Sequence, residues 1–422
     1  MGLSSLCGVF VLLSLVLVAF GGKTVLISLD GCRWDYFSKT STPNFDKFIS
    51  EGVQVKQVTN AFATLTMPNH WTLVTGLYEE DHGIIANKFW DPVWNKTYQF
   101  STESEWYNNT EPVWITAEKE GKKTASFMWI GNQAEYDGQT ASIVVPFASN
   151  TEFESGVDAV VEWMSKDNVD FANLYTNQPD HDGHQYGPNS EEVKNRIKAI
   201  DKVLGKMMDE FDTRGLTDEV NILIASDHGM TDVDSSKMIN LGAYIDFDAN
   251  IEWSYLSAIG LIIPKPGKLD EVYTKLKDAE KTETHMKVYK KADIPDDLKY
   301  KHNRRITDIV VVPDLGWLLA KKANHKTSLR GNHGFDNKNS DMKTTFLARG
   351  PDFKCGYKQD AMRSVDLYPL LCKLLDLQTC HASGGDITST QNLLSDGPCS
   401  FAITTTAGFH LILATFLIKI LM

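Results

Sequence analysis

Positive charge is scarce in this sequence. Lysine and arginine number 42 against 55 aspartate and glutamate residues, which gives a formal net charge of -13 at pH 7 and a pI near 5.3. Nucleic-acid polymers need a broad basic surface, so no nucleic-acid polymer is expected as a partner. A small phosphate substrate would need positive charge concentrated at one place, which bound metal ions could supply.

Cysteine is also rare, with 6 residues in a chain of 422. Cys7 lies in the apolar N-terminal stretch and is lost if that stretch is a signal peptide. Cleavage of the tail before Cys399 would then leave four cysteines, Cys32 and Cys355 among them, which is enough for two bridges. Cys372 and Cys380 are close in sequence and are expected to pair with each other. The alternative is that some of these residues are buried thiols.

The N-terminus lacks a basic segment before its apolar stretch. Residues 3–20 are apolar and are followed by two glycines, which indicates a signal peptide over residues 1–21; the alternative is an uncleaved signal anchor. The sequons at Asn95 and Asn108 fit glycosylation. The protein is therefore expected to follow the secretory pathway to the cell surface, on its extracellular face.

The C-terminal apolar tail, residues 407–422, has no polar residues after it and is short for a membrane span. Small residues and a polar spacer precede it. Residues 395–422 are therefore predicted to be the spacer and hydrophobic signal of a glycolipid membrane anchor. The alternatives are a C-terminal transmembrane segment or an amphipathic helix.

Short apolar runs rich in β-branched residues recur along the chain and indicate buried strands. Residues 191–210 carry apolar side chains at helical spacing. Strands that alternate with helices predict an α/β fold with a mostly parallel central sheet. The less regular, charged segment at about 231–330 is expected to be a small subdomain inserted into a catalytic domain of residues 22–394. The predicted strands are 24–30, 168–176, 219–227, 308–314 and 344–350.

Aspartate and histidine gather in four separated segments, each with a glycine beside a possible metal ligand. Asp30 and Asp227 end predicted strands, and ligands of parallel sheets lie at that edge. Because none of the candidate ligands is a cysteine, the donors suit catalytic zinc sites with an open position rather than closed structural ones. Any one segment alone could be a turn or a helix cap. Together they offer six ligands, enough for two zinc ions: Asp30, Asp180, His184, Asp227, His228 and His333.

The segment 64–76, TLTMPNHWTLVTG, reads as a loop that enters a helix, because a proline follows Thr66 within the first turn. Helix N-termini favour anions, so Thr66 would face a phosphate group. Zinc coordination lowers the pKa of a hydroxyl, which would make Thr66 a nucleophile. The alternative is that Thr66 only caps the helix. His70 is expected to be structural.

In their order along the chain, these motifs resemble those of the ecto-nucleotide pyrophosphatase/phosphodiesterase family, a branch of the alkaline phosphatase superfamily. The resemblance implies an alkaline phosphatase-like fold, with helices on both faces of the sheet. It also favours the short, membrane-anchored members, because the cysteine-rich and nuclease-like domains of larger relatives are missing. The motifs span residues 24–394 and comprise LDGCRWDY, TPNF, TxPNH, VTGLYEEDHGIIAN, PDxxGHxxGP, SDHGM and NHGFDN.

The resemblance assigns roles to the candidate residues. One zinc ion would be held by Asp180, His184 and His333. The other would be held by Asp30, Asp227 and His228, with the nucleophile Thr66 also coordinated to it. Asn87 would bind a nonbridging phosphate oxygen and, with the backbone N–H that follows Thr66, form an oxyanion site. Attack of Thr66 on phosphorus would give a phosphothreonine, and its hydrolysis would release a nucleoside 5′-monophosphate.

Two departures from the family bear on the substrate. Nucleotide-cleaving relatives often have an aromatic residue after the nucleophile and a tyrosine that stacks on the base. This chain has Met67 and, at the best-matching position, Phe147, and both are candidate substrate-binding residues; the alternative is that Phe147 is an ordinary core residue. Cys32 replaces another aromatic, with an effect left open. The expected substrates are ATP, dinucleoside polyphosphates or NAD.

Three other functions stay open. A choline-phosphodiester or lysophospholipid hydrolase would need aromatic side chains for cation–π contacts, which Trp71, Trp90 and Tyr175 could supply. A phosphomonoesterase is disfavoured by Asn87 through the resemblance alone. A catalytically silent surface binding protein is disfavoured by the intact nucleophile and the complete set of metal ligands.

Overall fold

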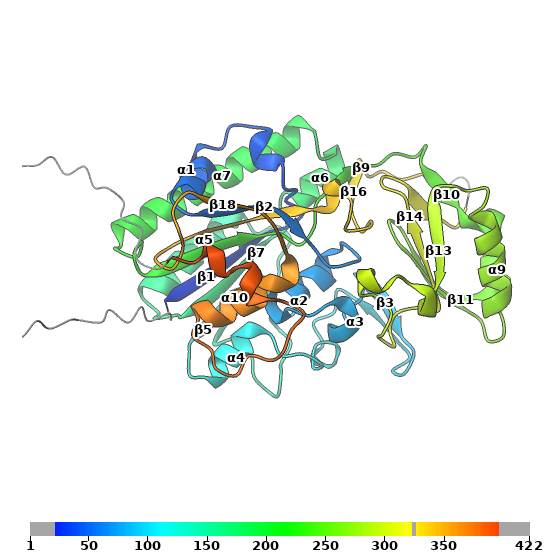
Figure 1. Ribbon diagram of the computed structural model, residues 1–422, viewed down its shortest axis with the longest axis horizontal. Helices are drawn as coiled ribbons and strands as arrows, with labels where there is room; N and C mark the ends of the chain where they lie inside the picture. The colour runs from blue at the N-terminus through cyan, green and yellow to red at the C-terminus, as the bar shows by residue number, and fades with distance from the viewer. Residues whose placement is uncertain (1–21, 323–325, 396–422) are drawn as a thin grey trace, which may run out of the picture.

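A mostly parallel sheet forms the centre of the molecule (Figure 1). A computed structural model describes residues 22–322 and 326–395. Five of the seven neighbouring strand pairs are parallel, and β17 is antiparallel to both of its neighbours. The predicted α/β fold with a mostly parallel sheet is therefore confirmed. The strand order is β18 (Tyr357–Arg363), β2 (Val53–Thr59), β17 (Thr344–Arg349), β8 (Val220–Ala225), β1 (Lys23–Leu29), β7 (Phe171–Thr176), β5 (Thr124–Phe127) and β6 (Ile143–Val145).

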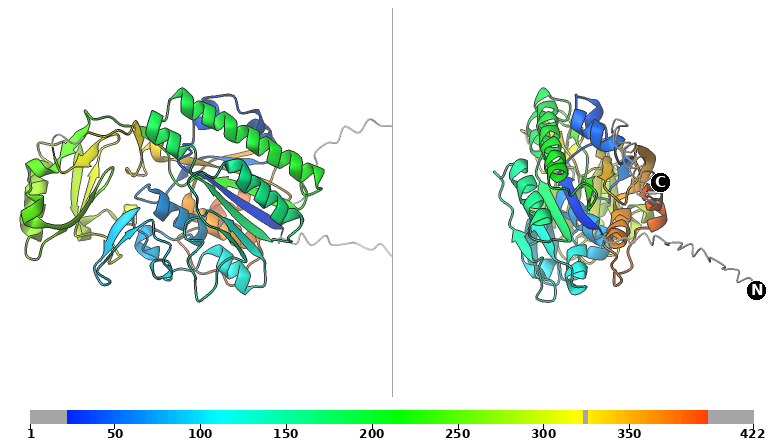
Figure 2. Two further views of the ribbon diagram at one scale, coloured as in Figure 1. Left: turned by 180° about the vertical axis from the view of Figure 1, so that it is seen from behind. Right: turned by 90° about the vertical axis from the view of Figure 1, so that its left-hand side faces the viewer.

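Helices cover both faces of this sheet (Figures 1 and 2). On one face α7 packs against α1 and α5, and on the other α2 packs against α4 and α10. The predicted helix at 191–210 is α7, which extends to Thr213 and buries an apolar stripe that includes Ile197 and Leu204. The helices are α1 (Pro43–Ser50), α2 (Thr66–Thr75), α3 (Glu79–His82), α4 (Val113–Lys119), α5 (Phe153–Ser165), α6 (Asp180–Tyr186), α7 (Glu191–Thr213), α8 (Phe247–Asn250), α9 (Leu269–Ala279) and α10 (Leu367–Leu374).

A second, smaller sheet lies beside the central one (Figure 1). The chain leaves the central body after β9 (Thr231–Asp232) and returns at β16 (Gly331–Asn332), and these two short strands pair with each other. Between them, four antiparallel strands with α9 enclose a separate hydrophobic core. Their order is β11 (Ile251–Leu256), β12 (Gly260–Pro264), β14 (Ile309–Pro313) and β13 (Met286–Lys290). Two short pairs complete the set: β10 (Met238–Asn240) with β15 (Leu318–Ala320), and β3 (Lys88–Asp91) with β4 (Lys96–Gln99).

One strand expectation was wrong in its placement. Residues 308–314 form β14, but β14 pairs antiparallel with β12 and β13 in the second sheet. A fully buried strand has the same apolar pattern in either kind of sheet, so the pattern could not identify its partners. The other four predicted strands lie in the central sheet as β1, β7, β8 and β17.

The predicted bridge between Cys372 and Cys380 is confirmed. Cys355 is also disulfide-bonded, and among the described cysteines Cys32 is a free, buried thiol. The predicted signal peptide at 1–21 and nearly all of the predicted anchor segment at 395–422 lie outside the described residues. No helix within the described ranges is long and apolar enough to cross a membrane.

Candidate active site

The carboxyl ends of three neighbouring parallel strands bring the candidate residues together. Leu29 of β1 pairs with Thr176 of β7, and Ser28 pairs with Ala225 of β8. Each strand is followed at once by polar residues: Asp30 after β1, α6 after β7 and Asp227 after β8. Apolar strands buried on both faces thus deliver aspartates and histidines to a single edge of the sheet.

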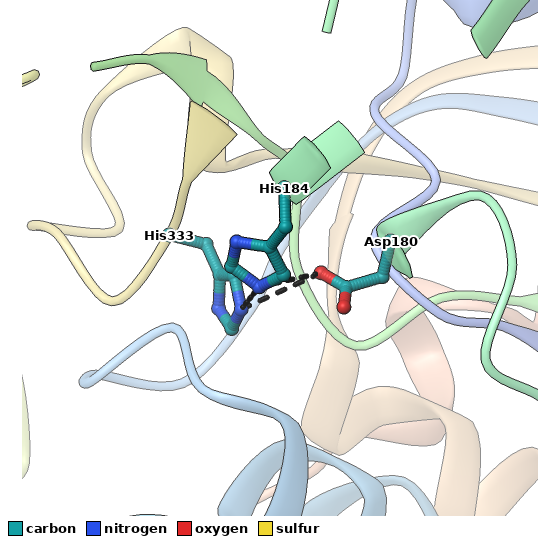
Figure 3. A group of neighbouring side chains, drawn as sticks. All are labelled: Asp180, His184 and His333. Atoms are coloured by element: carbon teal, nitrogen blue, oxygen red, sulfur yellow. Dashed lines mark hydrogen bonds and ion pairs between the residues drawn. The ribbon is translucent and has the colours of Figure 1, made fainter. Parts of the chain in front are cut away.

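Asp180, His184 and His333 converge at this edge (Figure 3). Asp180 Oδ1 lies 3.4 Å from His184 Nε2 and 3.5 Å from His333 Nε2, and the two Nε2 atoms are 3.2 Å apart. The Nδ1 atom of His184 lies 2.9 Å from the carbonyl oxygen of Gly331, and that of His333 lies 3.0 Å from the carbonyl of Thr64. A carbonyl only accepts, so Nδ1 carries the proton in both rings and both Nε2 lone pairs face the carboxylate. Metal-binding histidines are oriented in this way.

Asp30, Asp227 and His228 form a second group beside the first. His228 Nε2 lies 3.3 Å from Asp30 Oδ1 and 3.0 Å from Asp227 Oδ2. The same nitrogen is 3.2 Å from Thr66 Oγ1. The ligand atoms of Asp30, Asp180 and His228 also lie within 4.8 Å of one another, so the two groups are close enough to share one reacting centre.

The electrostatics of these groups fit bound cations. Asp30 Oδ1, Asp180 Oδ1 and Asp227 Oδ2 are buried and have no hydrogen-bond partner in the described part of the chain. Burial, with the nearby charges of Asp227 and Asp180, raises the pKa of Asp30 well above its ordinary value. Burial disfavours a charged Asp227 as well, but His228 and His70 hold its pKa below the ordinary value. Buried carboxylates that repel one another are stabilised when a divalent cation binds between them.

Histidine 333 would bind such a cation in its neutral form. Burial, together with His228 and His184, lowers the pKa of His333 well below its ordinary value. A neutral imidazole offers its lone pair to a metal, whereas a protonated one cannot. The donor set of carboxylates and imidazoles without thiolates is the set expected of a catalytic zinc site.

His70 is tied to the scaffold. Although it lies within ligand distance of Asp30 and Asp227, its Nε2 is 2.8 Å from Ser28 Oγ and its Nδ1 is 2.8 Å from the carbonyl oxygen of Thr66. Because both ring nitrogens have partners, His70 orients the start of α2, which agrees with a structural role.

Thr66 is the first residue of α2, and Leu65 occupies the cap position before it. Its hydroxyl faces His228 rather than the backbone of its own helix. The N–H of Met67 donates to Asn87 Oδ1 at 2.8 Å. This differs from the expected arrangement, in which that N–H binds a phosphate oxygen, because the amide of Asn87 is close enough to take it. The Asn87 NH₂ group is then the end of this side chain that can donate to a substrate.

Phe147 lies on the surface, two residues after the end of β6, and is 50% exposed. Its ring centre is 6.0 Å from that of Tyr175. An exposed ring beside the site can stack on a ligand, and it contributes little to the core. Met67 is only 6% exposed. Cys32 is buried, its N–H donates to Ser226 Oγ at 2.9 Å, and burial raises the pKa of its thiol.

Two supporting residues were not recognised from the sequence. The sequence suggests Tyr175 only as an aromatic surface for choline, but its hydroxyl donates to Asp30 Oδ2 at 2.6 Å. The N–H of Gly31 donates to Asp227 Oδ1 at 3.1 Å. Gly31 has a φ of +66°, and a Cβ there would lie 2.9 Å from the side chain of Asp180. The glycine in LDGCR was the available signal for this close approach.

The comparisons with known proteins agree with this geometry. A model of the family described as type I phosphodiesterase / nucleotide pyrophosphatase matches residues 24–336. The chain is 40% identical to human ectonucleotide pyrophosphatase/phosphodiesterase family member 5 over 379 residues, which cover 88% of this chain and 78% of that protein. It is 38% identical to human bis(5'-adenosyl)-triphosphatase ENPP4 over 388 residues, which cover 89% and 83%.

Solved structures show the same fold. A murine ectonucleotide pyrophosphatase/phosphodiesterase 5, inactive and in complex with AMP, matches with a TM-score of 0.84 at 38% identity and covers 89% of this chain and 100% of that chain. A mixed α/β sheet with aspartates and histidines grouped for metal binding at its carboxyl edge defines the class of metal-dependent hydrolases with the alkaline phosphatase-like fold. Within that class, the chain belongs to the type I phosphodiesterase/nucleotide pyrophosphatase family, as its motifs indicated.

Proposed function

We propose that this protein hydrolyses nucleotide pyrophosphate or phosphodiester bonds with two zinc ions and Thr66 as nucleophile, and releases nucleoside 5′-monophosphates. The observation that carries the proposal is the position of Thr66 Oγ1, 3.2 Å from His228 Nε2, at a centre where one buried carboxylate oxygen each of Asp30, Asp180 and Asp227 has no hydrogen-bond partner among the described residues. A hydroxyl placed there has no structural task, whereas a nucleophile needs this position.

The two zinc ions would be bound by separate sets of residues. One zinc ion would be held by Asp180, His184 and His333, and the other by Asp30, Asp227 and His228. When bound, zinc lowers the pKa of hydroxyl and water and stabilises charge on phosphate oxygens.

The site then holds the reacting groups in place. The start of α2 fixes Thr66 against the phosphorus atom, so that its Oγ1 can attack in line and form a phosphothreonine while the leaving group departs on the opposite side. Asn87 would donate its NH₂ group to a nonbridging oxygen. Water then cleaves the phosphothreonine and restores Thr66.

The nucleotide assignment rests on the relatives and on Phe147. The ENPP4 relative is named as a bis(5'-adenosyl)-triphosphatase, and the murine member 5 structure contains AMP. The exposed ring of Phe147 would stack on a base. The choline alternative loses two of its three aromatic residues, because Trp71 is 1% exposed and Tyr175 is 6% exposed, with its hydroxyl on Asp30; Trp90 is partly exposed and stays available. We also propose that the protein acts at the extracellular face of the cell surface, held by a glycolipid anchor.

Product analysis tests this function. The purified, zinc-loaded protein is incubated with ATP, NAD, a dinucleoside polyphosphate and glycerophosphocholine. Nucleoside monophosphate should appear with the wild type and fall at least about a thousandfold in Thr66→Ala, while Thr66→Ser, which keeps a hydroxyl, retains part of the rate. Zinc content should be the same in all three proteins. Phosphocholine as the main product would move the protein to the choline branch, and no turnover by metal-loaded protein would favour a silent binding protein.

A further inference from the structure

Residues 300–305 lie in the segment between β9 and β16. They form hydrogen bonds with the central body. The backbone N–H groups of Lys301 and His302 donate to Glu80 Oε2 in α3, at 2.8 and 3.1 Å. Asn303 Nδ2 donates to the carbonyl oxygen of Glu80 at 3.2 Å. Figure 1 shows α3 and β3 at the junction between the two sheets, where this stretch lies. These hydrogen bonds therefore dock the segment that belongs to the second sheet against α3 of the central body.

Tyr300 joins the two loops that build the phosphate end of the site. Its side chain is fully buried, and its hydroxyl donates to the carbonyl oxygen of Ile85 at 2.8 Å. Its ring packs edge-on against Phe62, with ring centres 5.2 Å apart. Ile85 lies two residues before Asn87, and Phe62 lies four residues before Thr66. A single side chain thus contacts the loop of the nucleophile and the loop of the phosphate-binding amide.

Arg305 fixes the same loop on both sides of Asn87. Its guanidinium is 1% exposed, and it donates from Nη1 to the carbonyl oxygen of Gly83 and from Nε to Asp91 Oδ2, both at 2.8 Å. Asp91 is fully buried at the end of β3. The guanidinium also lies 4.8 to 5.6 Å from the ring centres of three aromatic residues, Trp94, Trp106 and Phe89. A planar guanidinium group with several hydrogen-bond partners restrains the backbone more than a single hydrogen bond does.

These contacts are connected to the reacting centre through Asn87. Gly83 and Ile85 are held before Asn87, and Asp91 is held after it. Asn87 Oδ1 accepts the N–H of Met67, the residue after the proposed nucleophile. We propose that Tyr300 and Arg305 are positioning residues, through which the second sheet sets the Asn87 amide relative to Thr66. The inference rests on the proposed function only in so far as Asn87 binds the substrate phosphate.

Tyr300→Phe is the sharpest test, because it removes one hydroxyl and leaves the packing against Phe62. A misplaced catalytic group mainly slows the chemical step, so kcat with a nucleotide substrate should fall roughly tenfold, with little change in KM. Zinc content should not change. Tyr98→Phe is the matched control: Tyr98 is equally buried and also loses one bond, 2.8 Å to the hydroxyl of Tyr107, which lies outside residues 83–91, while the stacking of its ring on Phe89 is kept.

A double-mutant cycle separates positioning from a general loss of stability. If Tyr300 acts through Asn87, Tyr300→Phe should change kcat no further in an Asn87→Ala background. Additive effects would overturn the proposal. Arg305→Lys, which keeps the charge but loses the planar guanidinium group, should reduce kcat more strongly than Tyr300→Phe; equal rates in wild type and Arg305→Lys would also count against it.

Amide hydrogen exchange gives a readout that does not depend on turnover. Tyr300→Phe should speed exchange over residues 84–88 and at the Met67 amide, whereas Tyr98→Phe should leave both unchanged. If the wild-type protein hydrolyses no nucleotide, the proposed function fails and this measurement alone decides the positioning role. Unchanged exchange at both places in Tyr300→Phe would overturn it.

Discussion

At the scale of single residues, Asp30 is expected to favour the metal-bound protein and to destabilise the metal-free one. It is 2% exposed, Oδ1 has no hydrogen-bond partner among the described residues, and burial and two neighbouring aspartates raise its pKa. Asp30→Asn keeps the acceptor for Tyr175 but removes the charge. In chelator the variant should therefore melt several degrees higher than the wild type, since the repulsion with Asp227 and Asp180 is gone.

With zinc present, the order of stability should reverse. Asp30→Asn loses a charged ligand, so turnover should fall by more than the roughly 10- to 100-fold typical of outer-shell partners. Melting curves with and without chelator, alongside the rate, check both halves of this prediction. A variant that melts below the wild type in chelator would show that Asp30 stabilises the fold itself.

Glu79, the first residue of α3, is a buried acid without a counter-charge. It is fully buried, and neither carboxylate oxygen has a hydrogen-bond partner in the described ranges. Burial, with the nearby charges of Glu80 and Asp81, raises its pKa well above the ordinary value of 4.5. Its contribution to stability is therefore complete below about pH 4.5 and is lost as the pH rises through the folded-state pKa.

Glu79→Gln should accordingly melt at a higher temperature than the wild type at pH 8, because the amide has no charge to bury. The difference should shrink as the pH falls and vanish near pH 4.5. Thermal melts across this pH range test the sign, with the exposed Glu192→Gln as the control that should change little. A Glu79→Gln protein that is less stable at pH 8 than at pH 4.5, relative to wild type, would contradict it.

At the scale of elements, the apolar pattern predicted strands more reliably than their partners. The runs that became β1, β7 and β8 could be recognised because both faces of each strand are buried. The same pattern in β14 belongs to the other sheet. The edge strand β18 was missed, since most of its side chains are at least partly exposed and the apolar run is absent.

The proposed metal ligands were predictable for a local reason, because they fall in four short segments that each carry a glycine beside at least one of them. The contacts that support them were not, because they join distant parts of the chain. Tyr300 and Ile85 are 215 residues apart, and Tyr175 and Asp30 are 145 residues apart. No pattern within either segment records such a pairing.

The bridge between Cys372 and Cys380 ties α10 to the segment that supports the far end of α2. His381 Nε2 lies 2.9 Å from the carbonyl oxygen of Thr75, and the N–H of Gly384 donates to the carbonyl of Gly76 at 2.8 Å. The bridge closes a loop with a sequence separation of 8. A loop of this size constrains the unfolded chain by about 2 to 3 kcal/mol.

A Cys372→Ser/Cys380→Ser variant should therefore lose about 2 to 3 kcal/mol of unfolding free energy in urea. Its turnover at 25 °C should be close to that of the wild type, because Thr66 lies at the opposite end of α2. Loss of turnover without loss of stability would mean that α2 transmits the change to the nucleophile.

At the scale of the whole molecule, the two candidate metal-binding groups bring together residues that are far apart in the sequence. Asp30 follows β1, Asp227 follows β8, and His333 follows β16. β16 pairs with β9, and these strands form the base from which the second sheet leaves the central body. Bound metal would therefore fasten the second sheet as well as assemble the site.

Removal of the metal should destabilise both the site and the attachment of the second sheet. A ligand present at a thousandfold above its Kd stabilises a folded protein by about 4 kcal/mol, so chelation should lower the melting temperature and zinc should restore it. Calcium should not restore the melting temperature, since aspartate and histidine donors favour zinc.

Amide hydrogen exchange should become faster at residues 231–232 and 331–332 in the chelated protein. His333→Ala should lose about half of the zinc-dependent gain, because the Asp30 group remains. His285→Ala, at a partly exposed histidine away from the site, should keep all of it. Full stabilisation of His333→Ala by zinc would leave His333 outside the metal site and would return β16 to a purely structural role.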